Sequence, residues 1–321
     1  YLAYIAPHWP LQAPQASIAK YKGKYAQGYD VLYQQRVASA AKKGVLPENY
    51  QQVPRLADEP AWQTLTKKQR KVEQRKMEIY AAMLDDVDIH FGKLINFLKQ
   101  QGLFENTIIV IMSDNGAEGH DTKHGLTEFA EWIDECCNNS YDNMGKADSY
   151  VFQGPNWARA SGGPFSLFKD FAAEGGIRSP AIYHYPKQPL PDKLYRGFTH
   201  VKDIFPTLLN LANIAVPKEH VLGRATLTPS GRSLFNTQPQ VIDEGWELMG
   251  KQAYRYQQYK IVRDPAPYDT GEWTLYDLDK DPSEQYDLVK TKPAVFKMML
   301  KKWQHYAKVN NVITPDWLSG Y

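Results

Sequence analysis

Apolar side chains recur at three- and four-residue steps through residues 66–101. This spacing places them on one face of a helix, because 3.6 residues complete a turn. Thr66 with Gln69 three positions later forms the capping-box pattern of a helix start, and Gly102 is the residue type that ends helices. The sequence therefore predicts a long amphipathic helix whose apolar face packs on something large. That face comprises Val72, Tyr80, Met83, Leu84, Val87, Phe91, Leu94, Ile95 and Leu98.

The next segment, residues 107–112, is apolar apart from its first residue and rich in β-branched side chains. Such a run is typical of a strand buried on both faces of a parallel sheet. A long helix followed by a buried strand indicates the α/β class. Polarity changes abruptly at Ser113, Asp114 and Asn115, the carboxyl end of this strand, where open α/β sheets place their ligands. We expect the chemistry to lie there.

Weaker patterns predict the other elements of the first 235 residues. Residues 1–6 indicate an apolar strand already under way, and prolines at 7, 10 and 14 make the segment that carries His8 a loop. A helix is predicted over 29–43, closed by Gly44. Residues 116–163 are rich in Gly, Asn and Asp and predict a long functional loop with one short helix near 128–135. A strand over 181–185 and a helix over 203–214 follow.

Beyond about Phe235 the pattern changes to short strands. They are predicted over 252–256, 259–262 and 273–278, and a helix over 293–306 follows them. We interpret residues 1–235 as one domain with a mixed, mostly parallel sheet flanked by helices. Residues 236–321 are predicted to form a small α+β subdomain with an antiparallel sheet and a helix.

Composition narrows the function without selecting one. The 321 residues carry 38 Lys and Arg against 36 Asp and Glu, and the net charge of +2 gives no footprint for nucleic acid or an anionic membrane. No apolar run approaches the roughly 20 residues that span a bilayer, and no signal peptide is recognisable, so we expect a soluble chain. Cys136 and Cys137 are adjacent, which is a poor arrangement for a structural disulfide and leaves the redox compartment open.

Asp114 and Asn115 offer a carboxylate and an amide oxygen at a strand end. Hard cations such as Ca²⁺ and Mg²⁺ take oxygen ligands of this kind. The alternative is an Asx turn leaving the strand, and such turns are common. The position of the pair at the end of a buried strand favours the metal interpretation more than the dipeptide alone does.

His8 and Lys169 are the candidate groups for an anionic substrate. Imidazole titrates near neutral pH and can donate a proton to a leaving oxygen, whereas the Lys169 ammonium is a compact charge for an oxyanion. A surface-loop histidine and an exposed lysine are the alternatives. We interpret Lys123, His120 and His124 as loop residues near Asp114 and not as metal ligands. The acidic residues of the long helix are interpreted as a solvated face; they are Asp85, Asp86 and Asp88.

Taken in order, these segments resemble the formylglycine-dependent (type I) sulfatases of the alkaline phosphatase superfamily. The resemblance is carried by residues 3–10 (AYIAPHWP), 113–119 (SDNGAEG), Lys169 ahead of 174–178 (EGGIR), and 203–209 (DIFPTLL). Residues 275–278 (LYDL), 281–282 (DP) and 287–288 (DL) look like later landmarks of that family. The chain is most similar to bacterial arylsulfatases, through residues 21–25 (YKGKY) and 155–159 (PNWAR).

The resemblance implies roles for four residues. Asp114 and Asn115 would be Ca²⁺ ligands, His8 would contact the sulfate and protonate the leaving group, and Lys169 would bind sulfate oxygens. It implies a small sulfate ester as substrate, hydrolysed as sulfuric ester hydrolases do. A periplasmic or secreted location is favoured over the cytoplasm.

The sequence also departs from the family. Sulfatases use a Cys in a C-x-[PSA]-x-R segment, oxidised to formylglycine, and neither Cys136 nor Cys137 lies in one. The family's first metal-binding Asp pair is absent too. We therefore expect the C-terminal part of a sulfatase, inactive alone, with the missing N-terminal part as a partner. Two alternatives stay open: a phosphodiesterase or phosphonate monoester hydrolase of the superfamily, and a non-catalytic protein that binds sulfate or glycans.

Overall fold

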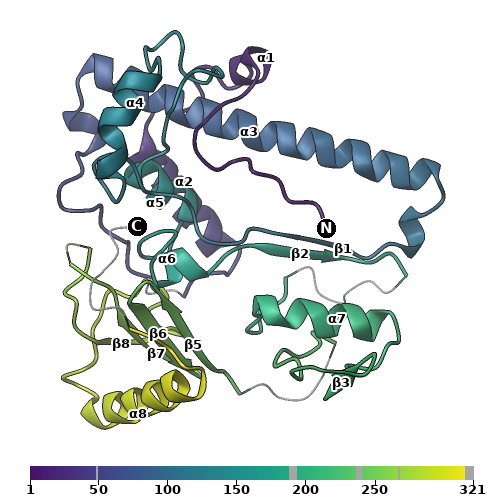
Figure 1. Ribbon diagram of the computed structural model, residues 1–321. Coiled ribbons are helices and arrows are strands. Elements are labelled where there is room, and N and C mark those ends of the chain that lie inside the picture. Colours follow the sequence, from purple (N-terminus) through teal and green to yellow (C-terminus); the bar gives the residue numbers. More distant parts are fainter. Residues whose placement is uncertain (48–49, 188–193, 236–240, 267, 315–321) are drawn as a thin grey trace.

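A computed structural model describes residues 1–47, 50–187, 194–235, 241–266 and 268–314, and helices and strands both contribute to it (Figure 1). Its helices lie mostly in the first half of the chain, and four strands of the second half form a sheet. Within the described ranges, no helix is both long and apolar enough to cross a bilayer. The chain thus has the α/β character that the sequence predicts.

The long predicted helix is α3, Lys67–Gln100. Thr66 caps it through a complete capping box with Gln69, and Gly102 follows its end with a positive φ of 69°, so both predicted boundaries are confirmed. The buried side chains lie in its first half and include Met77, Ile79 and Met83. Further along, no member of the predicted apolar face is buried, and Leu84 and Leu94 are exposed. The helix therefore packs against the described chain along only part of its length, as Figure 1 shows.

The first half of α3 packs on helices α2, Tyr29–Lys42, and α5, Pro155–Gly162, while the five-residue α1, Gln15–Ala19, lies beside it. Trp157 of α5 is fully buried here, and its indole N–H donates to the Glu73 carbonyl at 3.0 Å. The sequence predicts α2 correctly but treats residues 155–162 as loop. Pro155 at the first position and the Gly154 φ of 80° mark the start of this helix.

Strand β1, Ile109–Met112, pairs with β2, Ala181–His184. Both strands are predicted, but the pairing is antiparallel and Ile111 and Met112 are exposed. The prediction of a strand buried on both faces within a parallel sheet is therefore wrong for these residues, since β1 has one neighbour among the described strands. The sequence predicts a strand over residues 1–6, but these residues form no strand within the described chain, and residues 1–5 are exposed.

The C-terminal sheet has the order β5-β6-β7-β8, all antiparallel. Its strands are β5, Asp243–Leu248, β6, Lys251–Tyr256, β7, Tyr259–Arg263, and β8, Thr274–Asp277. Helix α8, Pro293–Val309, covers one face through Met299 and Trp303. Three strands and the helix match the prediction, whereas β5 is not predicted because its sequence DEGWEL is largely polar.

Shorter elements connect these units. Helix α7, Ile204–Leu211, follows a 3-10 turn, Val201–Asp203, and together they confirm the helix predicted over 203–214. Strands β3, His220–Val221, and β4, Arg224–Ala225, form a small hairpin. The remaining 3-10 turns are Trp62–Thr64, Phe104–Asn106 and Thr127–Phe129.

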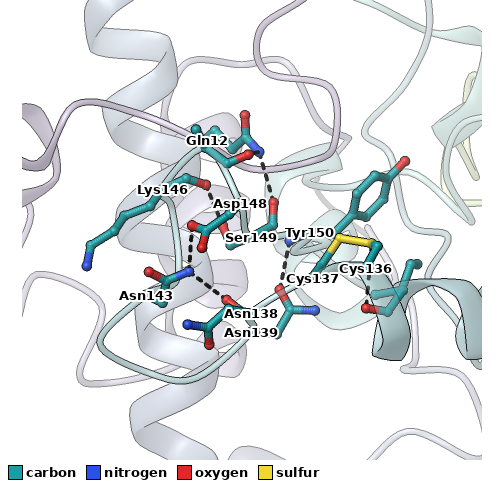
Figure 2. The surroundings of a disulfide bond; sticks show 12 residues. Gln12, Cys136, Cys137, Asn138, Asn139, Asn143, Lys146, Asp148, Ser149 and Tyr150 are labelled. Atoms are coloured by element: carbon teal, nitrogen blue, oxygen red, sulfur yellow. Dashed lines mark hydrogen bonds between the residues drawn. A yellow bond between two sulfur atoms is a disulfide. The ribbon is translucent and has the colours of Figure 1, made fainter.

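Cys136 and Cys137 are joined by a disulfide bond. The interpretation of these adjacent cysteines as a poor arrangement for a disulfide is therefore wrong. Cys136 is the last residue of α4, Ala130–Cys136, so the bond lies where the chain leaves the helix (Figure 2). A sharp exit there follows from the extended backbone of Cys137, and it directs the chain into residues 138–150.

Candidate active site

The structure brings His8 and Lys169 together although 161 positions separate them in the sequence. Lys169 Nζ lies 2.8 Å from His8 Nε2, and His8 Nδ1 lies 2.9 Å from the Trp9 carbonyl oxygen. Because a carbonyl only accepts, Nδ1 must carry the proton, and Nε2 of the neutral ring accepts from the ammonium. Two groups able to carry positive charge thus meet at one point. His8 itself lies in a turn with its side chain partly exposed, so it is a loop histidine that also contacts Lys169.

Glu118 supplies the negative charge that balances this pair. Its carboxylate is buried, 2.7 Å from Lys169 Nζ and 3.8 Å from His8 Nε2. The same carboxylate accepts from His120 Nδ1 at 2.7 Å and from the His120 backbone N–H at 2.9 Å. Burial opposes its ionisation, but the hydrogen bonds from His120 and Lys169 lower the pKa of Glu118 to about 2. The carboxylate is therefore charged across the physiological range.

Behind Glu118 the network continues into the protein. His120 is 1% exposed, and its Nε2 lies 3.9 Å from a carboxylate oxygen of Asp170, which is also paired with Lys251. The rings of Phe168 and Phe171 pack against His120, with centroids at 5.2 and 6.1 Å. His120 is a loop residue, as the sequence indicates, and it is also a buried link between Glu118 and Asp170. Such a network holds Glu118, and through it Lys169, in a defined position.

Close backbone packing positions the Lys169 segment against the loop that follows β1. Lys169 N–H donates to the Ala117 carbonyl at 2.8 Å, and Gly116 N–H donates to the Gly176 carbonyl at 2.8 Å. A Cβ on Gly116 would lie 1.7 Å from the Gly175 carbonyl oxygen, so no larger residue fits. The backbones of Gly175 and Gly176 therefore lie directly against Gly116. Sequence neighbours of Asp114 are in this way fixed beside Lys169.

Asp114 and Asn115 follow the end of β1. Asn115 lies two residues before Ala117, whose carbonyl accepts from the Lys169 backbone N–H. Asp114 is exposed, and its Oδ1 accepts from the Asn115 backbone N–H at 3.1 Å. The Asn115 amide donates to the Gly116 carbonyl at 2.9 Å, which leaves its oxygen as an acceptor. One carboxylate and one amide oxygen fit the chemistry of Ca²⁺, but they supply two of its roughly 6–8 ligands. Among the described residues no group of three or more His, Cys, Asp or Glu is arranged to hold a metal.

The other residues considered in the sequence lie apart from the His8–Lys169 contact. His124 interacts with Asp121, at 2.9 Å, and Asp58, at 3.0 Å. On α3, Asp85 pairs with Lys20 of the α1 region at 2.7 Å, and Asp86 accepts from Ser17 at 2.7 Å. These α3 carboxylates thus hold α1 in place and are not part of the site.

Glu118 and Asp170 are the residues that the sequence analysis does not identify. The position of Glu118 in the sequence is consistent with a role in the site, because it lies in the polar segment after β1, four positions beyond Asp114. A carboxylate as buried as Glu118 also needs a cationic partner, which Lys169 supplies, since an unpaired charge is costly inside a protein. The sequence does not say which of several acidic residues fills that role.

The lowered pKa of Glu118 predicts a specific acid sensitivity. Stability from this group is present above its ordinary pKa, near 4.5, and is lost as the pH falls toward its folded value of about 2. We expect the wild-type chain to lose on the order of 3 kcal/mol over this interval relative to Glu118→Gln. Urea unfolding of both proteins between pH 7 and pH 2 measures the difference. Parallel stability curves for the two proteins would contradict the ion-pair assignment.

Comparison with known proteins adds a family. A family profile described as Sulfatase matches residues 1–214. An uncharacterised sulfatase of Schizosaccharomyces pombe is 37% identical, over 98% of this chain and 59% of its own length. An arylsulfatase of Klebsiella aerogenes is 35% identical, over 74% of this chain and 51% of its own. The solved structure of Ps i-CgsB with k-i-k-neocarrahexaose superposes with a TM-score of 0.56 and 21% identity, over 99% of this chain and 51% of that one. The chain therefore spans a little over half the length of these relatives.

Proposed function

Because the chain belongs to the sulfatase family, we propose that its residues form the anion-binding and acid-donating side of a sulfuric ester hydrolase site. The observation that carries this proposal is the 2.8 Å contact between His8 and Lys169, backed by buried Glu118. A sulfate ester presents three oxygens that share one negative charge, and such a group suits a pair of adjacent cations. Side chains of this kind hold oxyanions through charge-assisted hydrogen bonds.

Lys169 binds sulfate oxygens in this proposal. Its ammonium has three donors, of which one points to Glu118 and one to His8, and a bound sulfate takes the place of His8 as acceptor. The negative Glu118 keeps Lys169 charged and oriented. Glu118 does not cancel the site's attraction for sulfate, because His8 is a second group beside Lys169 that is able to carry positive charge.

His8 acts as the general acid. Hydrolysis of the ester breaks the bond between sulfur and the bridging oxygen, and that oxygen leaves as an alcohol or phenol after it receives a proton. His8 Nε2, once protonated, is the donor on the side of the site that this chain builds, while the Nδ1 bond to the Trp9 carbonyl fixes the ring. Proton donation of this kind is worth about 10²–10⁴ in rate.

Asp114 and Asn115 hold Ca²⁺ in this proposal, as two oxygen ligands among others. The ion would supply positive charge to the site, and formylglycine supplies the nucleophile in the family. No C-x-[PSA]-x-R segment occurs in the 321 residues. We therefore propose that the nucleophile and the other metal ligands come from residues outside this sequence, and that the 321-residue chain alone binds sulfate without turning over its esters.

Sulfate binding to the 321-residue chain tests the anion role directly. We expect Lys169→Met to weaken the binding of inorganic sulfate about 10-fold or more, because a hydrogen bond to a charged group contributes about 1.5–3 kcal/mol. Isothermal titration calorimetry at fixed ionic strength measures the affinity. The matched control is Lys297→Met, which removes an exposed lysine on α8.

Loss of Lys169 also leaves Glu118 buried without its cation, so a second variant is needed. Lys169→Met combined with Glu118→Gln removes both charges and should remain folded while binding sulfate as weakly as the single variant. Unchanged sulfate affinity in the folded double variant would refute the assignment of Lys169.

A further inference from the structure

An apolar pocket of about 380 Å³ includes Trp9, the residue that follows His8, in its lining. Five of its six lining residues are aromatic. The six lining residues are Trp9, Leu126, Phe129, Trp132, Tyr150 and Phe152. Phe129 and Trp132 are half exposed, at 45% and 50%, whereas Leu126 and Phe152 are buried. Exposed aromatic side chains around a buried floor are typical of a ligand site.

The walls of this pocket come from three segments that are fixed to one another. The Leu11 backbone N–H donates to the Val151 carbonyl at 2.8 Å, which ties the Trp9 wall to the segment of Tyr150 and Phe152. The Gln12 side chain adds a bond to the Ser149 carbonyl at 2.9 Å (Figure 2). The pocket therefore exists before any ligand arrives.

The third wall is the start of α4 with the 3-10 turn before it. Trp132 packs edge-on against Tyr150, with ring centroids 5.4 Å apart, and Tyr150 packs against Trp9 at 5.8 Å. The Cys136–Cys137 disulfide fixes the other end of α4, from which the chain passes through residues 138–149 to Tyr150 (Figure 2). Both ends of this loop are therefore attached to the pocket wall.

Trp9 links the pocket to the acid. It follows His8 in the sequence, the two ring centroids are 4.6 Å apart, and its carbonyl accepts from His8 Nδ1. In a sulfate ester one bridging oxygen separates the sulfur from the rest of the leaving group. A leaving group whose oxygen receives the His8 proton must therefore lie close to the Trp9 ring, which packs against His8.

The lining selects the chemistry of this group. Three polar side-chain groups occur in the six residues, two indole N–H groups and one phenol, so a sugar ring would leave most of its hydroxyls without partners. Flat aromatic rings pack well in such surroundings. A cavity of about 150 Å³ accommodates benzene, and this pocket is more than twice that size. We propose that it binds a leaving group of two fused or linked aromatic rings and thereby sets the specificity of the site; this inference rests on the proposed sulfuric ester hydrolase function.

The test compares three sulfate esters on the 321-residue chain: 2-naphthyl sulfate, phenyl sulfate and methyl sulfate, each titrated by calorimetry. We expect affinity to rise in the order methyl, phenyl, naphthyl, with naphthyl bound at least about 10-fold more tightly than methyl. Trp132→Ala and Phe129→Ala should each remove about 5- to 10-fold of the naphthyl affinity and leave methyl sulfate unchanged. Phe205→Ala, a half-exposed phenylalanine of α7, is the matched control. Circular dichroism confirms that each variant is folded.

Two further ligands separate this inference from the function on which it rests. If inorganic sulfate binds but the three esters bind equally, the pocket assignment is overturned and the proposed function stands. If 2-naphthol binds in a Trp132-dependent way but inorganic sulfate does not bind, the aromatic pocket stands and the hydrolase proposal fails. Concentration-dependent dimerisation that Trp132→Ala abolishes would assign the pocket to a second copy of the chain and overturn the inference.

Discussion

Replacing Lys260 with Met is expected to destabilise the protein by about 3–5 kcal/mol, because it leaves buried carboxylates without their cation. Lys260 is fully buried on β7, with Nζ 2.9 Å from Glu174 and 2.8 Å from Glu284. Burial opposes the charge on this lysine, yet the two carboxylates outweigh it and raise the Lys260 pKa. Burial in turn raises the pKa of Glu284. Urea unfolding at pH 8 measures the loss.

The pH dependence of Lys260→Met has a definite sign. A carboxyl whose folded pKa lies above its unfolded value is most compatible with the fold when protonated, and stability falls as the pH rises through the folded pKa. The loss in free energy of unfolding caused by Lys260→Met should therefore be larger at pH 8 than at pH 5. Combining it with Glu174→Gln and Glu284→Gln should recover part of the stability. A deficit independent of pH, or no recovery in the triple variant, would show that lost packing and not charge is responsible.

This ion cluster connects the C-terminal sheet to the site. The backbone N–H of Glu174 donates to Glu284 at 2.7 Å, and Asp264 accepts from the backbone N–H groups of Ala172 and Ala173 at 3.0 and 3.1 Å. All of these donors lie three to five residues beyond Lys169. Burial disfavours the charged form of the Asp264 carboxyl and raises its pKa to about 6. The sheet of residues 243–277 therefore positions the segment that carries Lys169.

Elements with strong local signals could be predicted from the sequence, and elements defined by tertiary contacts could not. The cap of Thr66 and the stop at Gly102 are local, and α3 begins and ends where they indicate. The α/β class and the alkaline phosphatase-like fold are confirmed by the solved relatives. Burial on both faces of β1 is not local, since it depends on which strands lie beside it, and here β2 alone does so among the described strands. The division at residue 235 stays a prediction.

The candidate site shows the same limit. The sequence indicates His8 and Lys169 separately, each by its own chemistry, but it contains no distance between residues 161 positions apart, and the structure brings them together. Glu118 and the aromatic pocket were missed because burial and convergence from separate segments create them. The usual spacing of paired cysteines argues against a bond between Cys136 and Cys137. That rule does not describe adjacent cysteines at the point where the chain leaves a helix sharply. Roles for Asp114 and Asn115 stay predictions.

Replacing His8 with Ala is expected to lower turnover of phenyl sulfate by about 10²–10⁴ in a form of the protein that includes the nucleophile segment. The reason is the loss of the proton donor for the leaving oxygen. Phenolate is a poor leaving group and needs the proton, whereas 4-nitrophenolate is stable without it. The same variant should therefore lose much less activity on 4-nitrophenyl sulfate. Steady-state kcat values for both esters measure the contrast, with His305→Ala, an exposed histidine of α8, as the matched control.

The ratio of the two losses identifies what His8 does. A general acid gives a loss that grows with the basicity of the leaving oxygen, because the proton is transferred in the step that breaks the bond to sulfur. A residue that only binds sulfate gives equal losses for both esters, because the sulfate group is the same in each. Equal losses would reassign His8 to anion binding beside Lys169. The 2.8 Å contact between the two side chains allows either role, and only the comparison of leaving groups separates them.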